Sequence, residues 1–96
     1  MDFEWSDLKE SDNIKKHGVS FSDAKSAFYD ANRVILLDEK HSGQEVRFLC
    51  LGKVKGATMT VRFTYRREVI RIFGAAYWRK GRKTYEKIQK NQTDEN

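Results

Sequence analysis

A strict alternation of apolar and polar residues from Thr58 to Arg66 constrains the fold more than any other part of the chain. The apolar positions are Met59, Val61, Phe63 and Tyr65. A period of two indicates a half-buried β-strand, because successive side chains of a strand point to opposite faces of the sheet. A second apolar segment, Val69 to Phe73, follows closely enough to pair with this strand in a hairpin with a tight turn at Arg66-Arg67.

The register of this hairpin predicts a pair of facing arginines. A turn at Arg66-Arg67 that keeps the apolar side chains on one face sets Arg62 opposite Arg71. Like charges directly across a ladder repel, so two facing arginines make physical sense if an anion such as an RNA phosphate lies between them. The alternative is that each arginine pairs with a carboxylate from elsewhere in the chain, such as Glu45 or Glu86.

Two amphipathic helices are expected before the strands. Ser6 can cap the first helix, and Gly18 suits its C-terminal end directly after a run of three basic residues. Ser20 can cap the second helix, which is expected to end near Asp30-Ala31-Asn32. Its apolar face is formed by Phe21, Ala24 and Phe28.

The remaining segments complete an α+β fold. Arg33 to Asp38 is expected to be a buried strand and Val46 to Leu51 a central one, with a turn over Gly52 to Gly56. A last helix is expected from Tyr77, with residues 91–96 as a frayed tail. The prediction is a single domain, residues 1–96, with two N-terminal helices packed on a four-stranded antiparallel sheet and a C-terminal helix.

Charge is distributed unevenly along the 96 residues. Residues 1–46 hold 6 Lys and Arg against 10 Asp and Glu, a net charge of −4, whereas residues 47–96 hold 13 against 4, a net charge of +9. A basic surface most often meets nucleic acid or an acidic protein partner, although lysines also serve solubility alone. Seven of the eight arginines lie in the second half, and the planar guanidinium suits phosphate.

Several classes of protein are not expected. No apolar run is long enough to span a membrane, and the acidic start, Met1-Asp2-Phe3-Glu4, does not resemble a secretory signal, so a cytoplasmic protein is expected. The single cysteine, Cys50, cannot form an internal disulfide. There is no cluster of metal-ligating residues and no glycine-rich phosphate loop, so neither a metal nor another cofactor is expected.

Aromatic and basic residues alternate around Tyr77 and Trp78, which precede Arg79, Lys80, Arg82 and Lys83. This mixture is typical of surfaces on which unpaired nucleotides stack. Trp78 also fits the apolar stripe of the last helix, which favours a packing role and leaves Tyr77 as the better stacking candidate. His41, in a loop between strands, is either a general base or an ordinary surface histidine.

A characteristic order of residues runs from Phe3 to about residue 86. Its first block is Phe3-Glu4-Trp5, Lys9, Asn13, Lys16-His17-Gly18-Val19-Ser20-Phe21, Ala24 and Phe28. Its second block is Asp38, His41-Ser42, Glu45-Val46-Arg47, Leu51-Gly52, Thr64, Arg67 and Ile70-Arg71-Ile72. This order resembles the BrnT family of bacterial toxins, and the segment from Lys16 to Phe21 is its most specific part.

The resemblance implies a RelE-like ribonuclease fold and the function of a toxin in a type II toxin–antitoxin pair. Such a toxin is expected to inhibit translation by cleaving RNA. The expected partners are the RNA substrate and a cognate ribbon-helix-helix antitoxin, in a complex of two toxins and two antitoxins that binds promoter DNA.

The resemblance also implies a metal-independent endoribonuclease, in which the RNA 2′-hydroxyl attacks the adjacent phosphorus and a 5′-hydroxyl leaves. The expected catalytic residues are Arg62, Arg71, His41 and Tyr77. The expected RNA-binding residues are Lys53, Arg66, Trp78, Arg79 and Arg82. Ala76 stands where many members carry an arginine, and Tyr77 and Arg79 are the candidates to replace it. The competing interpretation is a non-catalytic basic module that docks an acidic protein or a nucleic acid.

Overall fold

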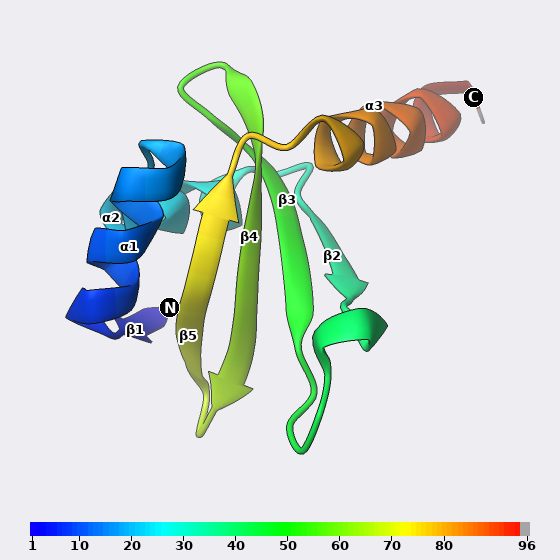
Figure 1. Ribbon diagram of the computed structural model, residues 1–96. Coiled ribbons are helices and arrows are strands. Elements are labelled where there is room, and N and C mark those ends of the chain that lie inside the picture. Colours follow the sequence, from blue (N-terminus) through cyan, green and yellow to red (C-terminus); the bar gives the residue numbers. More distant parts are fainter. Residues whose placement is uncertain (95–96) are drawn as a thin grey trace.

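The computed structural model, in which residues 1–94 are described, confirms an α+β architecture (Figure 1). The strands are β1 (Asp2–Trp5), β2 (Val34–Leu37), β3 (Phe48–Val54), β4 (Ala57–Arg66) and β5 (Val69–Ala76). The α-helices are α1 (Asp7–His17), α2 (Phe21–Ala24) and α3 (Arg79–Asp94). Two 3₁₀ turns, η1 (Lys25–Tyr29) and η2 (Glu39–His41), follow α2 and β2.

The sheet has five strands rather than the predicted four, in the order β1-β5-β4-β3-β2. The additional strand, β1, pairs parallel to β5, so the sheet is mixed and the prediction of an antiparallel sheet is wrong at this edge. The pairing joins Asp2 to Val69 across most of the chain, so the local pattern of a four-residue segment could not predict it. Phe3 and Trp5 of β1 pack against the core.

Both predicted N-terminal helix caps are confirmed. The side-chain oxygen of Ser6 accepts the backbone N–H of Lys9, and Gly18 ends α1 with a φ of 68°. Ser20 likewise caps α2, which tightens into η1 at Lys25 and ends at Tyr29, next to the predicted end at Asp30-Ala31-Asn32. At Gly52 in β3, a Cβ would collide with the carbonyl oxygen of Ala27, so this glycine lets η1 approach the sheet.

The core lies between one face of the sheet and the segments α2 and η1, whereas α1 packs beside β5. Its largest fully buried side chains include Phe21, Phe28 and Phe63. Burial raises the pKa of the Cys50 thiol, also in this core, to about 12, which keeps the thiol protonated at neutral pH. On the opposite face of the sheet, α3 crosses one end and packs on β4.

The strand β2 is an edge strand, because it pairs with β3 alone. The prediction that this segment is buried is wrong, since the side chains of Ile35 and Leu37 are 41% and 52% exposed. The neighbouring strand β3 lies between β2 and β4, as predicted, but it continues through Val54. The turn to β4 is therefore only Lys55-Gly56, rather than the predicted Gly52 to Gly56.

The hairpin of β4 and β5 forms as predicted, but its register differs. The turn residues are Arg67 and Glu68, and a bulge shifts the register farther from the turn, between Arg62 and Phe63. Arg71 therefore lies opposite Thr64 and Arg62 opposite Gly74, so the predicted facing pair is wrong. Both registers keep the same residues on the core face, so the apolar pattern alone could not choose between them.

The C-terminal helix begins at Arg79 and projects away from the end of the sheet (Figure 1). A Cβ on Gly81 would collide with the hydroxyl oxygen of Thr60, so this glycine allows α3 to cross β4 closely. The Tyr85 hydroxyl donates to Asp30 at 2.7 Å and ties the helix to the end of η1. The helix continues through Asp94, beyond the predicted start of the tail at residue 91, and 95–96 lie outside the described residues. Over the described range, no helix is both long and apolar enough to cross a membrane.

Candidate active site

A pocket of about 640 Å³ lies on the sheet face opposite the core. Its walls come from β2, η2, β3, β4 and the first turns of α3. Side chains that alternate away from the core along β3 and β4 form its floor, including Leu49, Leu51 and Thr60. The pocket therefore lies on this face between η2 and the start of α3.

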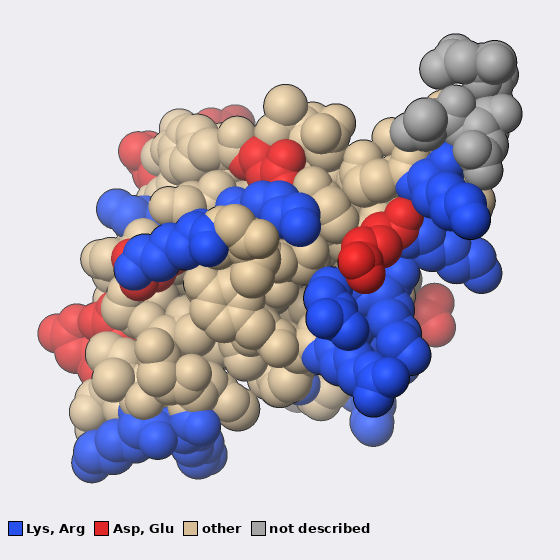
Figure 2. All heavy atoms as spheres, turned by 90° about the horizontal axis from the view of Figure 1, so that it is seen from above, with Lys and Arg blue, Asp and Glu red and all other residues tan. Residues whose placement is uncertain are grey.

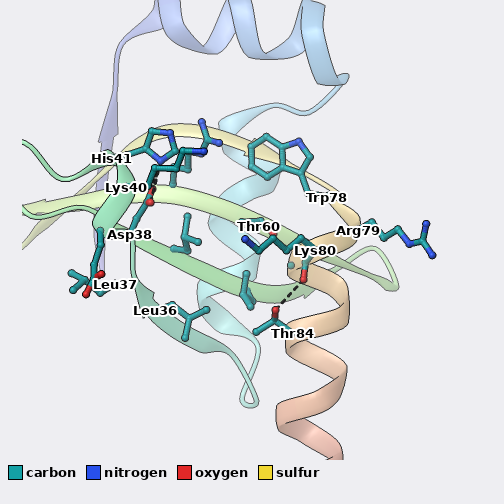
Figure 3. Close-up of a pocket in the computed structure, with 15 residues that line it drawn as sticks. Leu36, Leu37, Asp38, Lys40, His41, Thr60, Trp78, Arg79, Lys80 and Thr84 are labelled. Carbon is teal, nitrogen blue, oxygen red and sulfur yellow. Dashed lines mark hydrogen bonds and ion pairs between the residues drawn. The ribbon is translucent and has the colours of Figure 1, made fainter.

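One wall of the pocket carries a pair formed by Asp38 and His41 (Figure 3). The Nδ1 atom of His41 lies 3.0 Å from each carboxylate oxygen of Asp38. Asp38 is buried, with only 8% of its surface exposed. The histidine side chain is 40% exposed. With Nδ1 engaged by the carboxylate, Nε2 is the ring nitrogen available to a substrate.

The backbone around this pair is held by a local hydrogen-bond network. The Asp38 N–H donates to the carbonyl oxygen of Arg47 at 2.8 Å, and the Ser42 hydroxyl donates to the Asp38 carbonyl oxygen at 2.8 Å. The Arg47 N–H in turn donates to the Ser42 hydroxyl oxygen at 2.9 Å. These bonds fix the loop between β2 and β3, so the imidazole is oriented by a rigid support.

Arg62 and Trp78 form a second element of the pocket. The guanidinium carbon of Arg62 lies 4.7 Å from the centre of the Trp78 ring, which also meets His17 edge to face at 5.4 Å. Within residues 1–94, Arg62 makes no ion pair. A cation stacked on an aromatic ring and without a carboxylate partner is suited to bind a phosphate.

The pocket brings together four of the nine predicted site residues: His41, Arg62, Trp78 and Arg79. In Figure 3 the Arg79 side chain points away from the pocket, whereas Trp78 and Lys80 border it. Of the two candidate stacking residues, Trp78 lines this pocket and Tyr77 does not. The Tyr77 hydroxyl instead donates to the carbonyl oxygen of Val54 at 3.2 Å.

The other predicted site residues lie outside this pocket, and most are engaged elsewhere. Arg71 pairs with its cross-strand neighbour Glu4 at 2.6 Å. An ion pair with a carboxylate was the alternative to the phosphate site, but Glu4 was not among the partners that sequence reasoning named. The ammonium group of Lys53 lies 5.7 Å from the centre of the Tyr85 ring. The remaining two form ion pairs, Arg66 with Glu45 at 3.1 Å and Arg82 with Glu86 at 3.9 Å.

Sequence reasoning did not assign a catalytic role to Asp38, which lines the pocket. The available signal was its spacing from His41, which follows three residues later, directly after a strand. Thr60 is 4% exposed and its hydroxyl has no hydrogen-bond partner among the described residues. The closeness of Thr60 to α3 depends on this helix crossing β4, which the local sequence does not show.

Basic side chains surround the pocket on its helical side. Figure 2 shows Lys and Arg gathered where α3 lies, next to the C-terminal end of the chain. The residues of α3 that contribute are Arg79, Lys80, Arg82, Lys83, Lys87 and Lys90. Such a concentration of positive charge attracts a polyanion to the pocket.

Comparison with known proteins identifies the family of the chain. Residues 5–81 match the family model described as the ribonuclease toxin BrnT of type II toxin–antitoxin systems. No curated protein matches the chain. Because the matched range covers most of the chain, from β1 to the first turn of α3, the protein belongs to the BrnT family of ribonuclease toxins.

Proposed function

We propose that the chain cleaves RNA in the pocket between η2 and α3, without a metal ion, by attack of the RNA 2′-hydroxyl on the adjacent phosphorus. The observation that carries the proposal is the Asp38–His41 pair in the same pocket as an arginine stacked on Trp78. The pocket thus combines a candidate base, a free cation and an aromatic ring. Family membership supports ribonuclease activity in general.

In this proposal, Nε2 of His41 removes the proton from the attacking 2′-hydroxyl. Asp38 holds the imidazole with its proton on Nδ1 and stabilises the positive charge that the ring gains. Arg62 stabilises the negative charge that develops on the phosphorane oxygens, the task for which preorganised charge is most effective. Trp78 offers a ring for a base to stack on, and Lys80 and Arg79 bind flanking phosphates.

The reaction then yields a 2′,3′-cyclic phosphate on one fragment and a 5′-hydroxyl on the other. The O5′–phosphorus bond breaks as the O2′–phosphorus bond forms, and the leaving oxygen takes up a proton. Arg71 has no place in this scheme, because its guanidinium is tied to Glu4 in β1. Tyr77 has none either, because its hydroxyl bonds to the backbone of Val54 outside the pocket.

The family implies an antitoxin partner. We propose that this antitoxin has a ribbon-helix-helix DNA-binding part, that two toxins and two antitoxins form the complex, and that the complex binds promoter DNA. We also propose that the free toxin acts in the cytoplasm and inhibits translation by cutting RNA. The basic side chains of α3 support an acidic antitoxin, since complementary charge speeds association and fixes its register.

The experiment that tests the proposed reaction is incubation of the purified chain with single-stranded RNA in the presence of EDTA. We expect cleavage, with 5′-hydroxyl and cyclic phosphate ends identified by enzymatic labelling and mass spectrometry. His41→Gln is expected to abolish most of the activity while the protein stays folded. Loss of cutting in EDTA that magnesium restores would contradict the mechanism. RNA binding without any cleavage would favour the non-catalytic module instead.

A further inference from the structure

A second pocket, of about 540 Å³, adjoins the first one. Its lining includes His41, Glu45, Arg47 and Arg66. His41 lines both pockets and therefore stands at their boundary. A strand of RNA that places its reacting phosphate at His41 would extend into this second pocket on one side.

Glu45 is the carboxylate residue in the lining of the second pocket, where it lies beside two arginines. Its two carboxylate oxygens accept hydrogen bonds from the Arg66 guanidinium, one from Nη2 at 3.1 Å and one from Nε at 3.3 Å. Arg47 lies 3.8 Å from the same carboxylate. The hydrogen bond from Arg66 holds the pKa of Glu45 below its ordinary value, and the charges of Arg47 and Arg71 act in the same direction.

The cations here outnumber the carboxylates that act on them, Glu45 and, on Arg66, also Glu4. The ring of Phe73 has three positive groups around its centre, Arg47 at 4.1 Å, Lys9 at 4.9 Å and Arg66 at 6.0 Å. Cations that converge on one aromatic ring repel each other, so an additional anion is favoured beside them. Arg66 and Glu45 are half-exposed, so an incoming anion can reach the pair from solvent.

We propose that Arg47 and Arg66 form a subsite for an RNA phosphate next to the reacting one, and that Glu45 masks this subsite in the free protein as an internal competitor. The inference rests on the proposed function, since it places a second phosphate of the same substrate. A phosphodiester presents two anionic oxygens to the Arg66 fork, just as the Glu45 carboxylate does. RNA binding thus exchanges one anion for another, and the mask lowers affinity for RNA.

The test measures binding of the full chain to single-stranded RNA of mixed sequence in which every ribose carries a 2′-methoxy group. This probe cannot be cut, because the attacking hydroxyl is blocked. Glu45→Gln removes the mask, and we expect it to bind about two- to fivefold tighter, the usual strength of an exposed ion pair. The plot of log affinity against log salt concentration is expected to steepen by about 0.7, the slope for one more phosphate contact on a single strand.

Asp23→Asn is the matched control for the change in net charge. Asp23 lies in α2 on the core side of the sheet and pairs with Lys55 at 3.0 Å, outside both pockets. In an Arg66→Ala background, the gain from Glu45→Gln should shrink to that of Asp23→Asn. A gain that equals the control in the wild-type background, or that persists without Arg66, would overturn the masked subsite.

Cleavage of unmodified RNA by the wild-type chain, measured in parallel, separates this inference from the proposed function. A chain that cuts RNA but whose affinity does not respond to Glu45→Gln retains the proposed function and loses the subsite. A chain that shows the Glu45 effect but cuts no RNA loses the proposed catalysis and keeps the subsite as an RNA-binding surface. Absence of any binding overturns both.

Discussion

The two carboxylate oxygens of Asp38 each lie 3.0 Å from Nδ1 of His41, in a loop whose backbone is fixed from both sides. A carboxylate in this position keeps the proton on Nδ1 and so leaves the lone pair on Nε2. The relationship makes Asp38 a positioning residue for the proposed base.

Asp38→Asn should therefore lower the rate of RNA cleavage by about 10²- to 10⁴-fold, the usual contribution of a general base. The amide cannot stabilise the charged imidazole and can bond the wrong tautomer. Binding of the 2′-methoxy RNA should be unchanged, because the side chain at position 38 contacts His41 and not an RNA phosphate in the proposed scheme. Equal losses in binding and in cleavage would indicate that Asp38 only supports the loop.

Arg62→Ala and Arg71→Ala should separate function from stability. Arg62 has no ion pair among the described residues and lines the pocket, so its loss should reduce cleavage by about 10²- to 10³-fold with little effect on folding. Arg71 joins β5 to β1 through Glu4, so its loss should lower the free energy of unfolding by about 1 kcal/mol and leave cleavage largely intact.

Urea unfolding and cleavage assays on both variants measure this separation. The control is Glu4→Gln, which removes the same ion pair from the other side. Its effect on unfolding should not add to that of Arg71→Ala, because the two substitutions break one interaction. Abolished cleavage in a stably folded Arg71→Ala protein would restore the catalytic role that the facing-arginine register suggested.

The two hairpin turns predict opposite effects of glycine. Arg67 and Glu68 have φ angles of 52° and 71°, in the left-handed region that costs a non-glycine residue about 1 kcal/mol. Glu68→Gly should therefore stabilise the protein by up to about 1 kcal/mol. In the other hairpin, Gly56 has a φ of 83°, and Gly56→Ala should destabilise the protein by a similar amount. Thermal unfolding of the two variants checks both signs.

The sequence predicts the elements of this fold well and their pairing less well. The capping residues Ser6, Gly18 and Ser20 marked helix ends, because capping is a local interaction that a few residues decide. The strand β1 was missed because its partner β5 lies at the other end of the chain. The register of β4 and β5 was missed because both alternatives bury the same apolar face.

For the candidate site, too, sequence reasoning found residue types but not the contacts between them. His41 and Arg62 were predicted, since their chemistry is visible in the residue types and in the alternation of the strand. The support of His41 by Asp38 depends on how the loop closes, and the stacking of Arg62 on Trp78 depends on the bulge and on where α3 begins. The ion pair of Arg71 with Glu4 depends on β1, so sequence reasoning that missed this strand could not name the partner.

The bond from the Tyr85 hydroxyl to Asp30, 2.7 Å long, predicts a pH-dependent stability. Burial, and then the bond to Asp30, raise the pKa of Tyr85 to about 12. Burial alone would raise the pKa of Asp30, but bonds from Tyr85 and from the backbone of Lys53 and Asn32 together lower it. The bond therefore requires a protonated tyrosine and an ionised aspartate.

Tyr85→Phe should accordingly lower the free energy of unfolding by about 1 kcal/mol near pH 7, as for a hydrogen bond to a charged group that is partly exposed. A raised tyrosine pKa contributes stability that is present below pH 10.0 and lost as the pH rises to about 12. A lowered aspartate pKa contributes stability that is present above pH 3.8 and lost as the pH falls through the lowered value. The difference between wild type and variant should therefore shrink at both extremes. Urea unfolding across this range measures it, and a difference that stays constant would show that Tyr85 stabilises α3 by packing rather than through Asp30.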